Sequence, residues 1–115
     1  MDLVAKYLES WNTTDAAARR ALIDELWAED GSYTDPLAVA EGRDAIDATI
    51  AAVQGQFAGL RFALAGPVDA HHDIARFTWT LGPDGGEPLV VGFDVAVLDN
   101  GRIRAIHGFL DKIPA

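Results

Sequence analysis

The sequence contains no cysteine and few basic residues, with 9 lysines and arginines against 18 aspartates and glutamates. The absence of cysteine excludes disulfide bonds, thiol nucleophiles and cysteine-ligated zinc sites. The net charge of −9 disfavours nucleic acids and anionic membranes as partners, because both bind through a basic surface. We therefore expect neither of them as a partner, and the excess of acidic residues mainly favours solubility.

The sequence also lacks an apolar segment long enough to span a membrane. Charged residues at Asp2, Lys6 and Glu9 interrupt the N-terminal segment where a secretion signal would be apolar, so we expect a cytoplasmic protein. Half of the 115 residues are hydrophobic, which argues against disorder. A chain of this length has one core, and we expect a single domain over residues 1–115.

Helical periodicity dominates the first half of the sequence. An amphipathic helix opens the chain and ends near Asn12, and a second runs from about Asp15 to about Trp27. Gly42 precedes a third helix with one apolar stripe. A short extended segment at 32–34 leads to Asp35-Pro36, where proline keeps the preceding residue out of helical geometry.

The pattern changes after Gly59 and predicts four strands, at about 60–65, 67–81, 88–99 and 102–110. The second strand is expected to bend near residues 71–73. Two turn signals, Pro83-Asp84-Gly85-Gly86 and Asn100-Gly101, separate the later strands. Three helices followed by an antiparallel sheet predict a two-layer α+β domain.

Asp94 interrupts the longest apolar run, residues 89–98. In a strand, Asp94 shares one face with Val90, Gly92, Ala96 and Leu98, all of them apolar or without a side chain. A carboxyl group in such surroundings must be paired, be neutral or line a cavity. Each of these states perturbs its pKa, which makes Asp94 a candidate functional acid.

The Asn100-Gly101 turn predicts a partner for Asp94. A two-residue loop pairs Asp99 with Arg102, and an unbroken register then places Asp94 opposite His107. Such a pair would be either a general acid/base couple or a buried structural pair.

Several segments, in order along nearly the whole chain, resemble the Δ5-3-ketosteroid isomerase branch of the NTF2-like (SnoaL-like) superfamily. They are Lys6-Tyr7-Leu8-Glu9, Thr34-Asp35-Pro36-Leu37, Gly42-Arg43-Asp44-Ala45-Ile46, the stretch 64–72, Phe93-Asp94-Val95, and Leu98-Asp99-Asn100-Gly101-Arg102-Ile103. The resemblance implies a cone-shaped domain with three N-terminal helices packed on a curved antiparallel or mixed β-sheet. It also implies a homodimer formed through the sheet face and an enzyme that uses no cofactor.

The resemblance implies that Asp35 is a catalytic base, and that Tyr7 and a protonated Asp94 donate to a developing enolate oxygen. Enolisation requires such a carboxylate at the C–H bond and donors preorganised at the carbonyl oxygen. The ligand would be a small apolar carbonyl compound. The other candidate binding residues are aromatic side chains suited to an apolar pocket and one histidine: Trp27, Tyr33, Phe57, Trp79, His107 and Phe109.

Three alternatives share this framework. A SnoaL-like polyketide cyclase would use the same enolate, and a non-catalytic module would use the cavity for ligand binding or the sheet for dimerisation. Epoxide hydrolysis is disfavoured, because Arg76-Phe77-Thr78 lacks the aspartate of an Arg-x-Asp arrangement. We expect no metal site at His71-His72-Asp73, since adjacent residues of a strand point to opposite faces.

Overall fold

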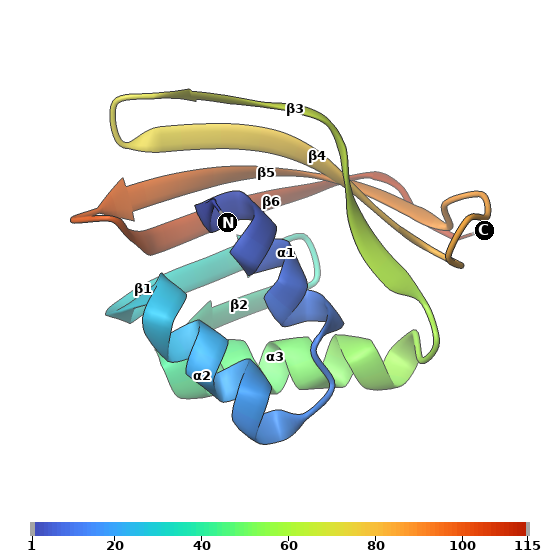
Figure 1. Cartoon of the computed structure of the whole chain (residues 1–115), viewed down its shortest axis with the longest axis horizontal. Helices are drawn as coiled ribbons and strands as arrows, with labels where there is room; N and C mark the ends of the chain where they lie inside the picture. Colours follow the sequence, from blue (N-terminus) through green and yellow to red (C-terminus); the bar gives the residue numbers. More distant parts are fainter. Residues whose placement is uncertain (1, 115) are drawn as a thin grey trace.

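Three helices lie on one face of a curved six-stranded sheet in the computed structural model, which describes residues 2–114 (Figure 1). The helices precede most of the sheet in the sequence, and the predicted α+β class is confirmed. The elements are α1 Leu3–Asn12, α2 Ala16–Leu26, β1 Trp27–Asp35, β2 Ala38–Glu41, α3 Arg43–Gln56, β3 Arg61–His71, β4 Ile74–Gly82, β5 Val90–Asp99 and β6 Arg102–Lys112.

The strands are arranged in the order β2-β1-β6-β5-β4-β3. All neighbours are antiparallel except β1 and β6, which are parallel, so the sheet is mixed. The core lies between the helices and the face of the sheet that carries Phe77, Trp79 and Leu81 of β4. This is the alternation predicted for that strand.

The first half of the chain contains more strand than the sequence predicts. Residues Trp27–Asp35 form a nine-residue strand β1, whereas the prediction gave a helix to about Trp27 and an extended piece at 32–34 only. The short strand β2 was not predicted. Pairing of β1 with β6 explains much of the difference, because it joins residues that are far apart in sequence. The β1–β2 pairing is a local hairpin around Asp35-Pro36 that the prediction missed.

The predicted boundary near Gly66 is wrong. The chain continues as β3 through Gly66 and Pro67 and reverses at His72, whose φ is +51°. Gly66 has a φ of +90° and lies within a shift of the β3–β4 register, so the Gly-Pro pair marks a bulge. The bulge accompanies the bend of β3 seen in Figure 1.

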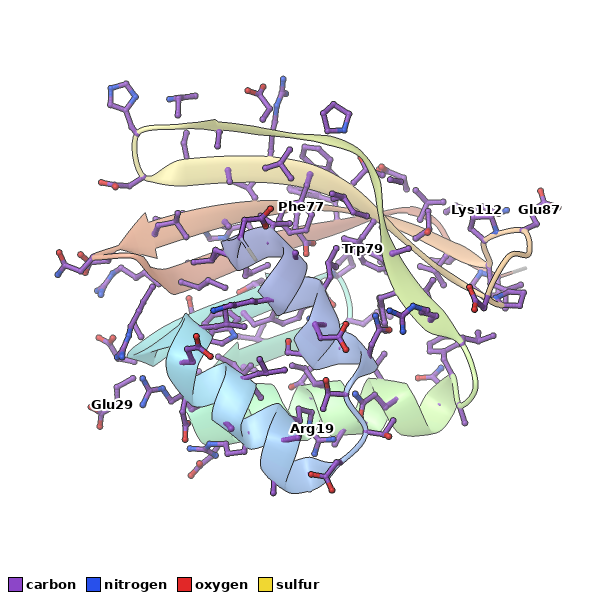
Figure 2. The ribbon with its side chains drawn as sticks, viewed as in Figure 1. Arg19, Glu29, Phe77, Trp79, Glu87 and Lys112 are labelled. Atoms are coloured by element: carbon purple, nitrogen blue, oxygen red, sulfur yellow. The ribbon has the colours of Figure 1, made fainter. Side chains whose placement is uncertain are left out.

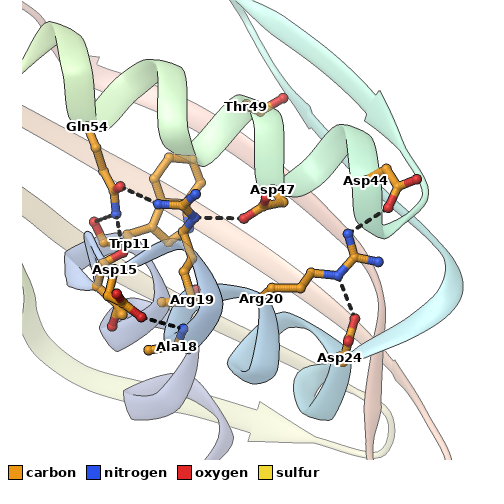
Figure 3. Close-up of polar contacts among 12 residues, drawn as sticks. Trp11, Asp15, Ala18, Arg19, Arg20, Asp24, Asp44, Asp47, Thr49 and Gln54 are labelled. Atoms are coloured by element: carbon orange, nitrogen blue, oxygen red, sulfur yellow. Dashed lines mark hydrogen bonds and ion pairs between the residues drawn. The ribbon is translucent and has the colours of Figure 1, made fainter.

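A buried arginine fixes the helices relative to one another (Figure 3). Arg19 of α2 is only 6% exposed, and its guanidinium donates to Asp47 at 2.7 Å and to the side-chain oxygen of Gln54 at 2.9 Å. Gln54 donates in turn to the Trp11 carbonyl at 3.0 Å. Because Trp11 belongs to α1, this network sets where that helix places Tyr7 over the sheet.

The predicted pairing of Asp94 with His107 is wrong. Leu98 faces Ile103 and Asp99 faces Arg102 as predicted, but Val97 faces Ala105. This shift places one extra residue in β6 and reverses which side chains face the core. Asp94 therefore lies opposite Gly108, while His107 is exposed on the other face of the sheet.

Candidate active site

A cavity of about 500 Å³ opens between α1, the end of α3 and the concave face of the sheet. Its inner wall contains buried Tyr7, Tyr33 and Asp94. Its mouth contains Leu37, which is 84% exposed, and Ile113, which is 60% exposed. A mostly apolar cavity with a few polar groups at its inner end is typical of a small-molecule site.

A continuous row of aromatic rings forms one wall of this cavity. The centroid distances are 5.6 Å between Tyr33 and Trp11, 5.3 Å between Trp11 and Phe62, and 5.4 Å between Phe62 and Trp79. Figure 2 shows Trp79 projecting from the sheet towards the helices. Rings that support one another in this way form a rigid apolar surface against which a flat ligand packs.

Gly92 makes room for Trp79. The two residues are register partners on β5 and β4, and a Cβ at position 92 would overlap the six-membered ring of the indole. Gly92→Ala should therefore push the ring into the cavity. We expect a loss of about 1 to 3 kcal/mol in the free energy of unfolding and weaker ligand binding.

Urea unfolding and ligand titration of the Gly92→Ala variant measure both effects. Gly55→Ala in α3 is the control, because nothing lies within 4 Å of a Cβ built there. It should not lower stability or affinity, since alanine favours a helix over glycine by about 0.5 to 1 kcal/mol. If Gly92→Ala leaves both the stability and the ligand affinity unchanged, then the position of the Trp79 indole does not require a glycine at residue 92.

Asp94 is 3% exposed on the inner wall of the cavity. Burial raises the pKa of its carboxyl group to about 7, while the Trp79 and Tyr7 donors that face it lower the pKa and the Asp35 charge raises it further. Among the described residues its Oδ1 atom has no hydrogen-bond partner. Near pH 7 this carboxyl group is therefore protonated in a substantial fraction of molecules.

Tyr7 faces the same carboxyl group from α1. Its ring lies 6.0 Å from Phe77 and 6.3 Å from Trp27, centroid to centroid. Burial, followed by the negative charge of Asp94, raises the pKa of the Tyr7 phenol well above its ordinary value. Tyr7 is thus a neutral hydrogen-bond donor at any physiological pH.

Asp35 is held in a fixed orientation at the end of β1. Its Oδ1 accepts from the backbone N–H groups of Leu37 and Ala38, each at 2.8 Å, and its Oδ2 accepts from the Tyr33 hydroxyl at 2.6 Å. These three hydrogen bonds fix the direction in which the carboxyl oxygens of Asp35 point. Asp35 thus both accepts the hydrogen bonds of the Asp-Pro turn and lines the cavity.

The structure brings Asp35, Tyr7 and Asp94 together at one cavity, with Gly108 between the two carboxyl groups. A Cβ at Gly108 would lie 2.9 Å from Asp94 Oδ1 and 3.3 Å from Asp35 Cβ. Glycine in β6 thus allows the two acids to face one cavity from different strands. The alternation of residues along β1 could have indicated that Tyr33 lies beside Asp35, but the sequence offered no signal for the role of Gly108.

Three of the six residues expected to bind the ligand lie outside the cavity. Trp27 is fully buried beneath Gly31 and does not line it, while His107 and Phe109 lie on the opposite face of the sheet. His107 and Phe109 lie on the opposite face because of the bulge in β6. Trp27 lies outside the cavity because β1 begins at this residue. The other three do line it: Tyr33, Phe57 and Trp79.

Among residues 2–114, no group of three or more histidine, aspartate or glutamate side chains is placed to hold a metal ion. No helix there has the length and hydrophobicity needed to cross a membrane.

Family membership follows from a sequence comparison: the SnoaL-like domain family matches residues 4–106. This chain belongs to the SnoaL-like family. No curated protein matches it. Its architecture is the NTF2-like fold. A candidate SnoaL-like isomerase from Agrobacterium tumefaciens superposes with a TM-score of 0.90. That structure is 42% identical, and the match covers 95% of this chain and 94% of the other.

Two more distant structures share the SnoaL-like fold. A candidate polyketide cyclase from Sinorhizobium meliloti is 21% identical, with a TM-score of 0.73 and 92% of each chain covered. A candidate ketosteroid isomerase from Kribbella flavida is 19% identical, with a TM-score of 0.72 and coverage of 98% of this chain and 78% of the other. At these identities the likeness extends to the fold alone.

Proposed function

We propose that this SnoaL-like protein isomerises an allylic ketone by proton transfer through a dienolate, without a cofactor. Asp35 acts as the base, and Tyr7 and Asp94 donate hydrogen bonds to the enolate oxygen. The observation that supports this most strongly is the buried Asp94, whose Oδ1 has no partner and whose pKa is raised to about 7. A carboxylic acid donates a hydrogen bond only while it is protonated.

The proposed reaction begins with a ketone whose oxygen lies between Tyr7 and Asp94. Asp35 removes a proton from the carbon next to the carbonyl, and the electrons move onto the carbonyl oxygen. Asp35, which now carries the proton, then returns it to the far end of the dienolate. This shifts the double bond into conjugation with the carbonyl group. The aromatic wall of the cavity excludes water, so the hydrogen bonds to the oxygen act in a medium of low dielectric constant.

The test adds a 3-keto-5-ene steroid to the wild-type protein and follows the absorbance of the conjugated enone. We expect turnover by the wild type. The double variant Tyr7→Phe with Asp94→Asn should lose at least about 10²-fold in kcat, because it lacks the phenol and the carboxylic acid. Absence of turnover by the wild type would refute the steroid isomerase, and equal turnover by the double variant would refute the donor roles.

A polyketide cyclase is the second candidate, since it needs the same base and enolate donors and a relative of the same fold is a candidate cyclase. A binding module without catalysis is the third. The homodimer also stays a prediction. Its expected interface is the face of the sheet that the helices leave uncovered, where Val39 is 73% exposed and Phe109 is 56% exposed.

A further inference from the structure

We infer that Oδ2 of Asp35 is the atom that takes and returns the proton, and that Tyr33 is the positioning residue that holds this atom in place. This inference rests on the proposed role of Asp35 as the base. It gives the Tyr33 hydroxyl a task in proton transfer, beyond lining the cavity. Two observations carry it: the unequal hydrogen bonding of the two carboxyl oxygens and the rigid setting of the Tyr33 ring.

The two oxygens of the Asp35 carboxyl group differ in how many acceptor positions remain open. Oδ1 accepts from the backbone N–H groups of Leu37 and Ala38, each at 2.8 Å, and these bonds use both of its lone pairs. Within the part of the chain that the structure describes, Oδ2 accepts one hydrogen bond, from the Tyr33 hydroxyl at 2.6 Å. One lone pair of Oδ2 is therefore left, and a proton from carbon can bind there.

The Tyr33 hydroxyl has little freedom to move away from Oδ2. Tyr33 is 4% exposed, and its ring packs on Trp11 at a centroid distance of 5.6 Å. Its backbone lies between two neighbouring strands, opposite Ala40 of β2 and Ile106 of β6. Tyr33 and Asp35 are two residues apart on β1, so the strand directs both side chains to the cavity.

Tyr33 acts only as a donor in this pair. Burial, followed by the hydrogen bond to Asp35 and the charge of Asp35, raises the pKa of the Tyr33 phenol above its ordinary value. The phenol therefore keeps its proton, and Asp35 is the partner that gains and loses one.

This arrangement lets one oxygen serve both proton transfers without rotation of the carboxyl group. In the first transfer the C–H bond breaks, an O–H bond forms at Oδ2, and the electron pair moves to the carbonyl oxygen of the ketone. Oδ1 keeps both N–H bonds, and Oδ2 keeps the Tyr33 bond on its other lone pair. In the second transfer the O–H bond breaks and a C–H bond forms at the far end of the dienolate. Without the Tyr33 hydroxyl, Oδ2 is held through Oδ1 alone, and a displaced base transfers the proton more slowly.

A double-mutant cycle with Asp35→Asn tests this role. Tyr33→Phe keeps the ring against Trp11 and removes only the hydroxyl. Its kcat for isomerisation should fall about 10- to 100-fold, with KM changed less than about twofold. In Asp35→Asn the side-chain oxygen keeps the two N–H bonds and an NH₂ group replaces Oδ2. Adding Tyr33→Phe to this variant should therefore change the residual kcat by less than about twofold.

Thr34→Val is the matched control, because Thr34 lies between the two residues on β1 and its side chain is exposed on the other face of the sheet. This variant should retain the wild-type kcat. A wild-type kcat in Tyr33→Phe would overturn the inference. A double variant that loses the product of the two single losses would also overturn it, because Tyr33 would then act independently of Asp35, on the substrate or on the stability of the fold.

Proton exchange in a saturated 3-ketosteroid tests the same role without isomerisation. In D₂O this ketone has no double bond to shift, and mass spectrometry follows the deuterium gained at the carbons next to the carbonyl group. Tyr33→Phe should slow this exchange at least about tenfold and have no further effect in Asp35→Asn. Exchange by the wild type without steroid isomerisation would refute only the isomerase. Absence of exchange by the wild type would overturn the inference, because Asp35 would then take no proton from carbon.

Discussion

Replacing Asp35 with asparagine should lower kcat for isomerisation by about 10²- to 10⁴-fold and leave KM nearly unchanged. The reason is that an amide cannot accept the proton from carbon. Asparagine keeps the local structure, because its side-chain oxygen can still accept from the N–H groups of Leu37 and Ala38. The loss should therefore lie in the chemical step, with binding of a neutral substrate preserved.

Initial rates over a range of substrate concentrations separate kcat from KM for this variant. Asp84→Asn, in an exposed loop, is the control and should retain the wild-type rate. A variant with wild-type kcat would remove Asp35 as the base. A variant with normal kcat and a raised KM would instead assign Asp35 to binding.

Replacing Asp94 with asparagine should make the protein more stable relative to the wild type as the pH rises from 4 to 8. The pKa of Asp94 is raised from 3.8 to about 7 in the folded protein, first of all by burial. Between these two values the unfolded chain has lost the proton while the folded protein retains it, so the stability of the wild type falls as the pH rises. The free energy lost is at most about 4 kcal/mol and is fully lost above pH 7.

Urea unfolding at pH 4, 6 and 8 measures this effect as the difference between Asp94→Asn and the wild type. Any cost of burying the asparagine amide is the same at each pH, so the change with pH reports the carboxyl group alone. Asp84→Asn should show no such change, because its side chain is exposed. If Asp94 were ionised and paired in the folded state, the variant would instead become less stable relative to the wild type as the pH rises.

Most elements of this fold could be predicted because their signals are local. The apolar spacing of α1 and the alternation along β4 place side chains on one face through the geometry of the helix and the strand. The Asn100-Gly101 turn was also predictable. Both residues have positive φ values, +52° and +78°, which the two-residue hairpin loop requires.

The site was predicted only in part, because its geometry depends on the packing of distant segments. Asp94 could be identified from its apolar neighbours within one strand. Its partner could not, because one extra residue in β6 moved His107 to the outer face and placed Gly108 opposite Asp94. A bulge of this kind carries no local signal, and it reverses every prediction made from an unbroken register.

Burial of a carboxyl group at position 94 follows from the sequence, since every neighbour on its face of the strand is apolar or lacks a side chain. The groups that this carboxyl faces depend on how the helices and strands pack. Packing of α1 over the sheet brought Tyr7 to it, and the ends of β1 and β6 brought Asp35 and Gly108. Strand periodicity sets the direction of a side chain, whereas its partners come from segments far away in the sequence.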